Sequence, residues 1–186
     1  MNSQAKLGMR SRRGQALAET AGLLCVFFIF LTFPLMNLGA IGMRACFVVN
    51  SAKVGAERAC KSLTYQVKAN VPDGTLANNT PAVTVAKNEV TRYLGSFSGA
   101  KLVSIKTGIV DINNVTGEKK GPFYTPLATL PQENHTYYVD VQVNAETEPL
   151  LSYKGGMLGD IPGLTAPFPL SMHGQRVFEN PKGLQM

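Results

Sequence analysis

The feature that most constrains this chain is a run of 24 consecutive uncharged residues between Glu19 and Arg44. An α-helix rises about 1.5 Å per residue, so this run reaches about 36 Å, more than the hydrocarbon core of about 30 Å in a typical bilayer. The run is also longer than the apolar region of about 7–15 residues in a cleavable secretory signal. We therefore predict a transmembrane helix over residues 15–43.

Positive charge is concentrated before this run. The first fourteen residues hold four basic side chains and no acid, whereas residues 44–186 hold 14 basic and 11 acidic residues. By the positive-inside rule, the chain is predicted to cross the inner (cytoplasmic) membrane once, with a cytoplasmic N-terminus and an exported C-terminal domain. No basic stripe of the kind that binds nucleic acid follows the run, and the pair Lys119-Lys120 is interpreted as part of a solvated loop.

Two residues of the apolar segment have properties beyond those of a plain anchor. Pro34 lacks a backbone N–H and is predicted to kink the helix or loosen one turn. Glu19 begins the segment. One interpretation is an interfacial carboxylate favoured by the helix dipole, and the other is a functional acid that needs a partner at the membrane boundary.

The order of features at the N-terminus resembles the type IV prepilin signal. A basic leader is followed by Gly14, by four further residues, by Glu19 and then by the long apolar helix. The resemblance implies that a prepilin peptidase cuts between Gly14 and Gln15, which makes residues 1–14 a leader peptide and Glu19 the fifth residue of the mature chain. The apolar helix would then survive processing and stay available for assembly.

Further similarity lies beyond the membrane segment. Residues Asn50 to Ala59 read Asn-x-Ala-x-x-Gly-Ala-x-x-Ala, Tyr137 to Val143 read Tyr-Tyr-Val-x-Val-x-Val, and Arg176 to Glu179 read Arg-Val-Phe-Glu. These segments resemble the TadE-like proteins, which are the pseudopilins or minor pilins of tight-adherence (Tad, Flp-type) pilus systems. The type within this group, TadE, TadF or TadG, stays open.

The resemblance implies a pilin-like α+β fold, with a long N-terminal helix and a small antiparallel sheet. It also implies a non-enzymatic subunit that takes part in assembly of a Tad or type IV-like pilus involved in adhesion, and that can be incorporated in it. The implied partners are the prepilin peptidase, a pilus assembly platform, the major pilin or other pseudopilins, and membrane lipid. No cofactor is implied.

Residues 44–64 are predicted to continue the helix beyond the membrane. Small side chains recur there at three- and four-residue spacing and form a stripe on one helix face. The stripe either packs on the chain's own domain, which we favour, or lets a helix of another subunit approach closely. Its residues are Ala45, Ala52, Gly55, Ala56 and Ala59.

Residues 65–186 are predicted to form an exported α+β domain. Turn-forming clusters at 72–74 and 78–81 precede a short helix, and strict alternation of apolar and polar residues marks the clearest strand. The sheet is expected to be antiparallel and covered on one face by the long helix. The predicted elements are a helix at Ala82–Gly95 and strands at 102–112 (broken by Gly108), 137–144 and 170–179.

An apolar loop over 149–169 joins the last two predicted strands. Such a long loop is usually functional or mobile. It is expected to pack under the sheet or to contact a neighbouring subunit.

The sequence contains no catalytic or metal-binding motif that we could identify. His135 and His173 are 38 residues apart and are interpreted as strand or surface histidines. Cys46 and Cys60 would be about 21 Å apart on a straight helix, too far for a disulfide. Either the helix breaks between them, or both are free, or they pair between chains.

Two alternatives to the pilin interpretation stay open. In the first, the chain is a single-pass signal-anchored exported protein or adhesin, and Gly14 and Glu19 are coincidental. In the second, signal peptidase cuts near residues 40–42 and releases a soluble domain. The N-terminal residue of the mature protein distinguishes all three.

Overall fold

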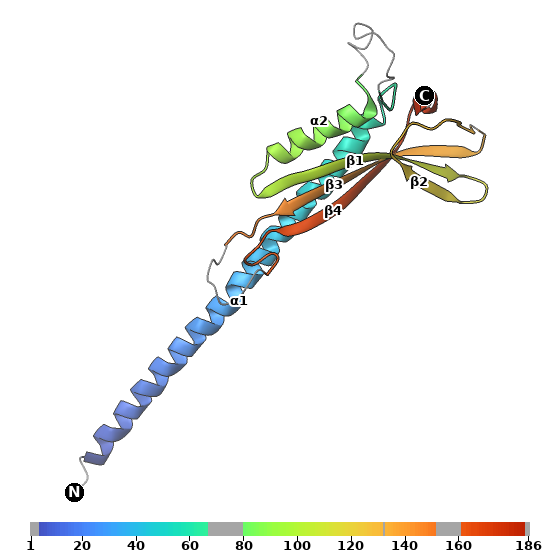
Figure 1. Ribbon diagram of the computed structural model, residues 1–186. Coiled ribbons are helices and arrows are strands. Elements are labelled where there is room, and N and C mark those ends of the chain that lie inside the picture. The colour runs from blue at the N-terminus through green and yellow to red at the C-terminus, as the bar shows by residue number, and fades with distance from the viewer. Residues whose placement is uncertain (1–3, 67–79, 132, 152–160, 185–186) are drawn as a thin grey trace.

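The computed structural model describes residues 4–66, 80–131, 133–151 and 161–184, with side chains from residue 18 onward. Figure 1 shows a long helical rod whose N-terminal half projects away from the rest of the chain. This arrangement confirms the predicted α+β class with a long N-terminal apolar helix and a small antiparallel sheet. The elements are α1 (Gln4–Ala59), α2 (Ala82–Gly95), β1 (Ala100–Asn113), β2 (Lys119–Phe123), β3 (His135–Thr147), β4 (Phe168–Val177) and the 3-10 helix η2 (Pro181–Leu184).

Helix α1 is continuous from the basic leader to the small-residue stripe. Pro34 lies inside it and does not end it, and the predicted kink at this residue stays a prediction. The helix ends at Ala59, five residues before the predicted end. It ends there because the backbone of the next residues bonds to the C-terminal segment: the N–H of Glu179 donates to the carbonyl of Cys60, and the N–H of Tyr65 donates to that of Gly183, both at 3.0 Å.

Helix α2 has the predicted bounds. Pro81 precedes it in an extended conformation, and Ser96 follows it. Its buried residues recur every fourth position and define one apolar face: Ala82, Ala86, Val90 and Leu94. This face packs against α1 and β1.

The sheet is wholly antiparallel and has the order β2-β1-β3-β4. β3 has the predicted alternation except at Asp140, which is also buried. Val139, Val141 and Val143 are buried on the helix side. Val139 pairs with Ile109 of β1, and Val141 pairs with Gly174 of β4. The helices therefore cover one face of the sheet, and Figure 1 shows them on the same side of it.

Two predictions in this region are wrong. The first strand is not broken at Gly108, because β1 runs on through it and Gly108 pairs with Asp140. Gly108 is instead a site of close approach by the edge strand β2, since a Cβ at this position would lie 2.8 Å from the Cβ of Pro122. The pair Lys119-Lys120 is exposed but lies on the edge strand β2, not in a loop.

The described parts of the apolar loop lie along α1, which corrects the expectation that the loop packs under the sheet. Leu151 bonds to Asn37, and the turn containing Gly163 packs on Ile41. The middle of the loop and the turn clusters at 72–74 and 78–79 lie outside the described residues.

Candidate functional site

The first half of α1 projects into the surroundings as an apolar rod. Every side chain from Ala18 to Met36 is exposed, and Phe30 exposes 76% of its surface. One helix of the described chain, extending from Ala18, is long and apolar enough to cross a membrane. The exposed large apolar residues of this half are Leu23, Leu24, Val26, Phe27, Phe28, Ile29, Phe30, Leu31, Phe33, Leu35 and Met36.

The residues of the predicted processing site lie on this helix. The backbone at Gly14 and Gln15 belongs to α1, and the side chain of Gln15 lies outside the described part of the chain. Glu19 is exposed at the start of the apolar rod. The helix has no acidic residue in its first turn, so the positive end of its dipole is not compensated there.

The small-residue stripe packs on the chain's own domain. Ala52, Ala56 and Ala59 are fully buried in the core, and Ala45 is half-buried. A Cβ at Gly55 would lie 2.7 Å from a methyl group of Val90 in α2. Small side chains are therefore required where α1 meets α2 and the sheet.

Gly174 of β4 marks the closest approach of the sheet to α1. A Cβ at this position would overlap the carbonyl of Ala52 and lie 2.6 Å from the amide nitrogen of Lys53. Two backbones meet there with no side chain between them. The sequence contains no local signal for this contact, because the two residues lie on different elements.

Arg44, at the end of the uncharged run, ties the domain to the helix. Its Nη1 donates to the carbonyl of Glu148, and its guanidinium packs on Gly99, where φ is +85° and no side chain is present. The N–H of Glu148 in turn donates to the carbonyl of Gly99 at 3.0 Å. The sequence indicated only a charged flank of the membrane segment.

Asn37 forms a second tie, deeper in the apolar run. Its side chain is only 2% exposed. Its Nδ2 donates to the carbonyl of Leu151 at 3.0 Å, and its Oδ1 accepts from the N–H of Leu151 at 2.9 Å. The one amide side chain of the uncharged run is thereby satisfied by a backbone 114 residues away.

An open apolar hollow of about 550 Å³ lies beside these ties. Leu150 lines it from the loop and Ser98 from the turn before β1, while α1 contributes Met36, Ala40 and Met43 among others. Phe47 also lines it, and its ring stacks on that of Phe97 with centroids 4.0 Å apart.

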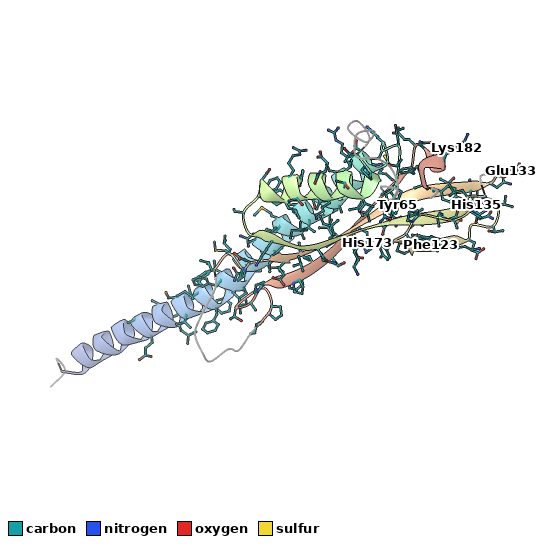
Figure 2. All side chains as sticks on the ribbon, turned by 45° about the horizontal axis from the view of Figure 1, so that its top comes forward. Tyr65, Phe123, Glu133, His135, His173 and Lys182 are labelled. Carbon is teal, nitrogen blue, oxygen red and sulfur yellow. The ribbon has the colours of Figure 1, made fainter. Side chains whose placement is uncertain are left out.

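Both histidines contact an aspartate on a neighbouring strand. The Nδ1 of His135 lies 2.7 Å from Asp111, and that of His173 lies 3.1 Å from Asp140. Sequence spacing could not reveal these pairs, because the strand register creates them. Figure 2 shows His135 at the end of the sheet farthest from the projecting helix and His173 nearer the middle.

Each pair has a further polar neighbour: Gln175 donates to Asp140 at 2.9 Å, and Asn113 lies 3.3 Å from His135. Among the residues whose side chains the structure describes, no three His, Cys, Asp or Glu side chains gather in a group that could hold a metal ion. Tyr137, near Asp111, donates to the carbonyl of Pro131 at 2.8 Å. Burial, and then the charge of Asp111, raises the pKa of Tyr137.

The three cysteines are free. Cys46 is exposed on α1, whereas Cys60 is buried and donates to the carbonyl of Glu57 at 3.2 Å. Burial, and then the charge of Glu179, raises the pKa of the Cys60 thiol. Helix α1 is continuous from Cys46 to Ala59, so the helix does not break between the two cysteines, and the expected lack of an intrachain bond stays a prediction.

Comparison of this chain with protein-family models, with curated proteins and with solved structures finds no match. The TadE-like resemblance therefore depends on the residues quoted above.

Proposed function

We propose that this chain is a non-enzymatic TadE-like minor pilin, anchored by α1 in the cytoplasmic membrane with its sheet domain on the exported side. A prepilin peptidase cuts it between Gly14 and Gln15, and the mature subunit joins a Tad-type pilus assembly. Its partners are the peptidase, the assembly platform, and the major pilin or other pseudopilins.

The observation that carries the proposal is the position of Gly14 and Glu19 relative to α1. They lie before an uncovered apolar half-helix, which continues without a break into the half that supports the sheet. A cut at Gly14 removes the basic leader and leaves the whole apolar rod on the domain. The rod can then anchor the subunit in lipid and afterwards pack among similar helices.

The two ties described above favour this cut over one near residues 40–42. Ala40 is buried, and Asn37 holds the backbone of Leu151. A cut near residues 40–42 would sever α1 inside the region where it packs on the domain. A cut at Gly14 leaves every described contact of the domain in place.

The N-terminal end of α1 is also suited to local unwinding, which a peptidase needs in order to reach the backbone. Gly14 lies inside α1, and glycine in a helix interior lowers helix stability by about 1 kcal/mol relative to alanine. Gly14 therefore provides a weak point close to the bond to be cut.

The test is the N-terminal sequence of the mature protein after co-expression with a cognate prepilin peptidase. We expect Gln15 as the first residue, and we expect Gly14→Leu to block processing because a bulky side chain obstructs the scissile site. Gly8→Leu is the matched control, since it places the same side chain elsewhere in the leader and should leave processing intact.

Other outcomes select the alternatives. A first residue near Met43 assigns the cut to signal peptidase and a released domain. An intact chain beginning at Met1 in the presence of active peptidase assigns the chain to the signal-anchored exported proteins.

A further inference from the structure

Two segments of the apolar loop present exposed apolar side chains beside α1, where the uncovered rod ends. The first contains Leu150 and Leu151, and the second is the turn 161–166; we name them together the collar. Leu150 exposes 50% of its surface and Ile161 exposes 41%. The collar adjoins the apolar rod directly, through Asn37 and Ile41.

The distance along α1 from Glu19 to the collar matches the thickness of the hydrocarbon core of a bilayer. Asn37 is 18 residues beyond Glu19, or about 27 Å along the helix axis, and Ile41 is about 33 Å beyond Glu19. With Glu19 at one edge of a hydrocarbon core of about 30 Å, these two residues lie on either side of the other edge. Arg44 then lies in the adjoining headgroup layer, where a long basic side chain near a helix end can keep its charge in the polar interface.

The backbone of the collar is suited to a setting with little water. Non-helical backbone tolerates membrane depth only where the protein satisfies its polar groups. Asn37 satisfies both the N–H and the carbonyl of Leu151. In the turn, the N–H of Ile161 donates to Oγ1 of Thr165 at 2.6 Å, and the carbonyl of Ile161 accepts from the N–H of Thr165 at 2.9 Å.

From these observations we infer that the collar inserts its apolar side chains into the leaflet adjoining the sheet domain. Leu150, Leu151 and Ile161 contact lipid at the boundary between acyl chains and headgroups, and Asn37 holds the first segment at that depth. The occupant of this surface is lipid, because the collar continues the apolar rod at the same level of the bilayer. The domain is thereby fixed in height and tilt against the membrane. This inference does not depend on the pilus proposal or on which leaflet faces the cytoplasm.

The chain contains no tryptophan, so single-tryptophan variants report one position each. The full chain is reconstituted in phosphatidylcholine–phosphatidylglycerol vesicles containing lipids brominated near the top of the acyl chain. The variants are Leu150→Trp, Ile161→Trp and, as control, Val115→Trp, which lies in the turn after β1 and exposes 73% of its surface. Far-ultraviolet circular dichroism verifies that each variant is folded.

We expect bromolipid to quench the first two variants at least roughly threefold more than Val115→Trp, because interfacial apolar side chains lie about 5–10 Å inside the boundary. Equal quenching of all three overturns the inference. Quenching that appears only when the protein is diluted tenfold in lipid also overturns it, because a second copy of the chain then covers the collar.

A further variant tests the role of Asn37. Adding Asn37→Ala to Leu150→Trp removes the two hydrogen bonds to Leu151. The quenching of the Leu150→Trp variant by bromolipid is then expected to fall toward the value for Val115→Trp. Adding it to Ile161→Trp should change little, because that turn satisfies its own backbone. Unchanged quenching of Leu150→Trp in the Asn37→Ala background overturns the positioning role of Asn37.

Discussion

The two halves of α1 share one secondary structure and have opposite surroundings. From Ala18 to Met36 the side chains are exposed and mostly large, whereas from Asn37 to Ala59 one face is buried and its residues are mostly small. Side-chain size, more than hydrophobicity, therefore distinguishes the part of this helix that the protein covers. Large apolar groups suit lipid, while the close approach of β4 and α2 requires Ala and Gly.

The largest expected effect comes from filling the contact between α1 and β4. Gly174→Ala places a methyl group against the backbone of Ala52, which cannot rotate away. We expect the free energy of unfolding to fall by about 3 kcal/mol or more, because relief requires the helix and the strand to separate. Denaturant unfolding in mild detergent measures the loss.

Gly22→Ala is the matched control in the uncovered half, where no atom lies within 4 Å of the added methyl group. It should leave the unfolding of the sheet domain unchanged. Equal effects of the two substitutions would contradict the distinction between the halves.

A smaller, pH-dependent effect is expected at Tyr65, just beyond the covered end of α1. Its hydroxyl donates to the carbonyl of Thr107 at 2.6 Å, and burial, with a smaller contribution from Tyr124, raises the pKa of Tyr65 from 10.0 to about 12. A raised pKa means that folding favours the neutral phenol. This stabilisation is complete below about pH 10 and is lost as the pH rises through about 12, up to about 3 kcal/mol.

Tyr65→Phe should therefore remove part of the fall in unfolding free energy between pH 10 and pH 12. Its control is Tyr138→Phe, because Tyr138 is half-buried on the uncovered face of the sheet. If the unfolding free energies of wild type and Tyr65→Phe fall in parallel between pH 10 and pH 12, ionisation of Tyr65 does not cause the loss of stability.

The smallest expected effect on stability comes from Glu19→Ala, since Glu19 is exposed on the uncovered half. The proposed function nevertheless gives it a large effect on assembly. After cleavage, the α-amino group of Gln15 and the Glu19 carboxylate of a neighbour can neutralise each other, and leaving either unpaired in an apolar setting costs on the order of several kcal/mol. Such a pair would set the axial register between subunits.

We expect Glu19→Ala to leave membrane insertion and most processing intact but to abolish co-purification with pilus components. Wild type and variant are compared after solubilisation in the same mild detergent. Recovery of the same partners in the same yield would argue for a plain anchor.

Strict local patterns predicted most of the elements. The alternation of β3 located that strand, because one buried face imposes its period, and the turn-forming cluster at 78–81 preceded the segment predicted as α2. The four-residue spacing of the buried face of α2 became clear only in the structure. Strand β2 was missed because Lys119 to Phe123 show no alternation and include Pro122, which is tolerated on an edge strand. The break predicted at Gly108 was wrong because its lack of a side chain makes room for Pro122, not for a turn.

The sequence by itself determined the α+β class, the long apolar helix and the small-residue stripe, because each depends on composition or spacing within one segment. Only the tertiary structure decided what those segments meet. Asn37 bonds to a residue 114 positions away, Arg44 bonds to one 104 positions away, and Gly174 meets Ala52. These contacts depend on how the loop and β4 return along α1, and that path follows from burial of the whole core rather than from any local pattern.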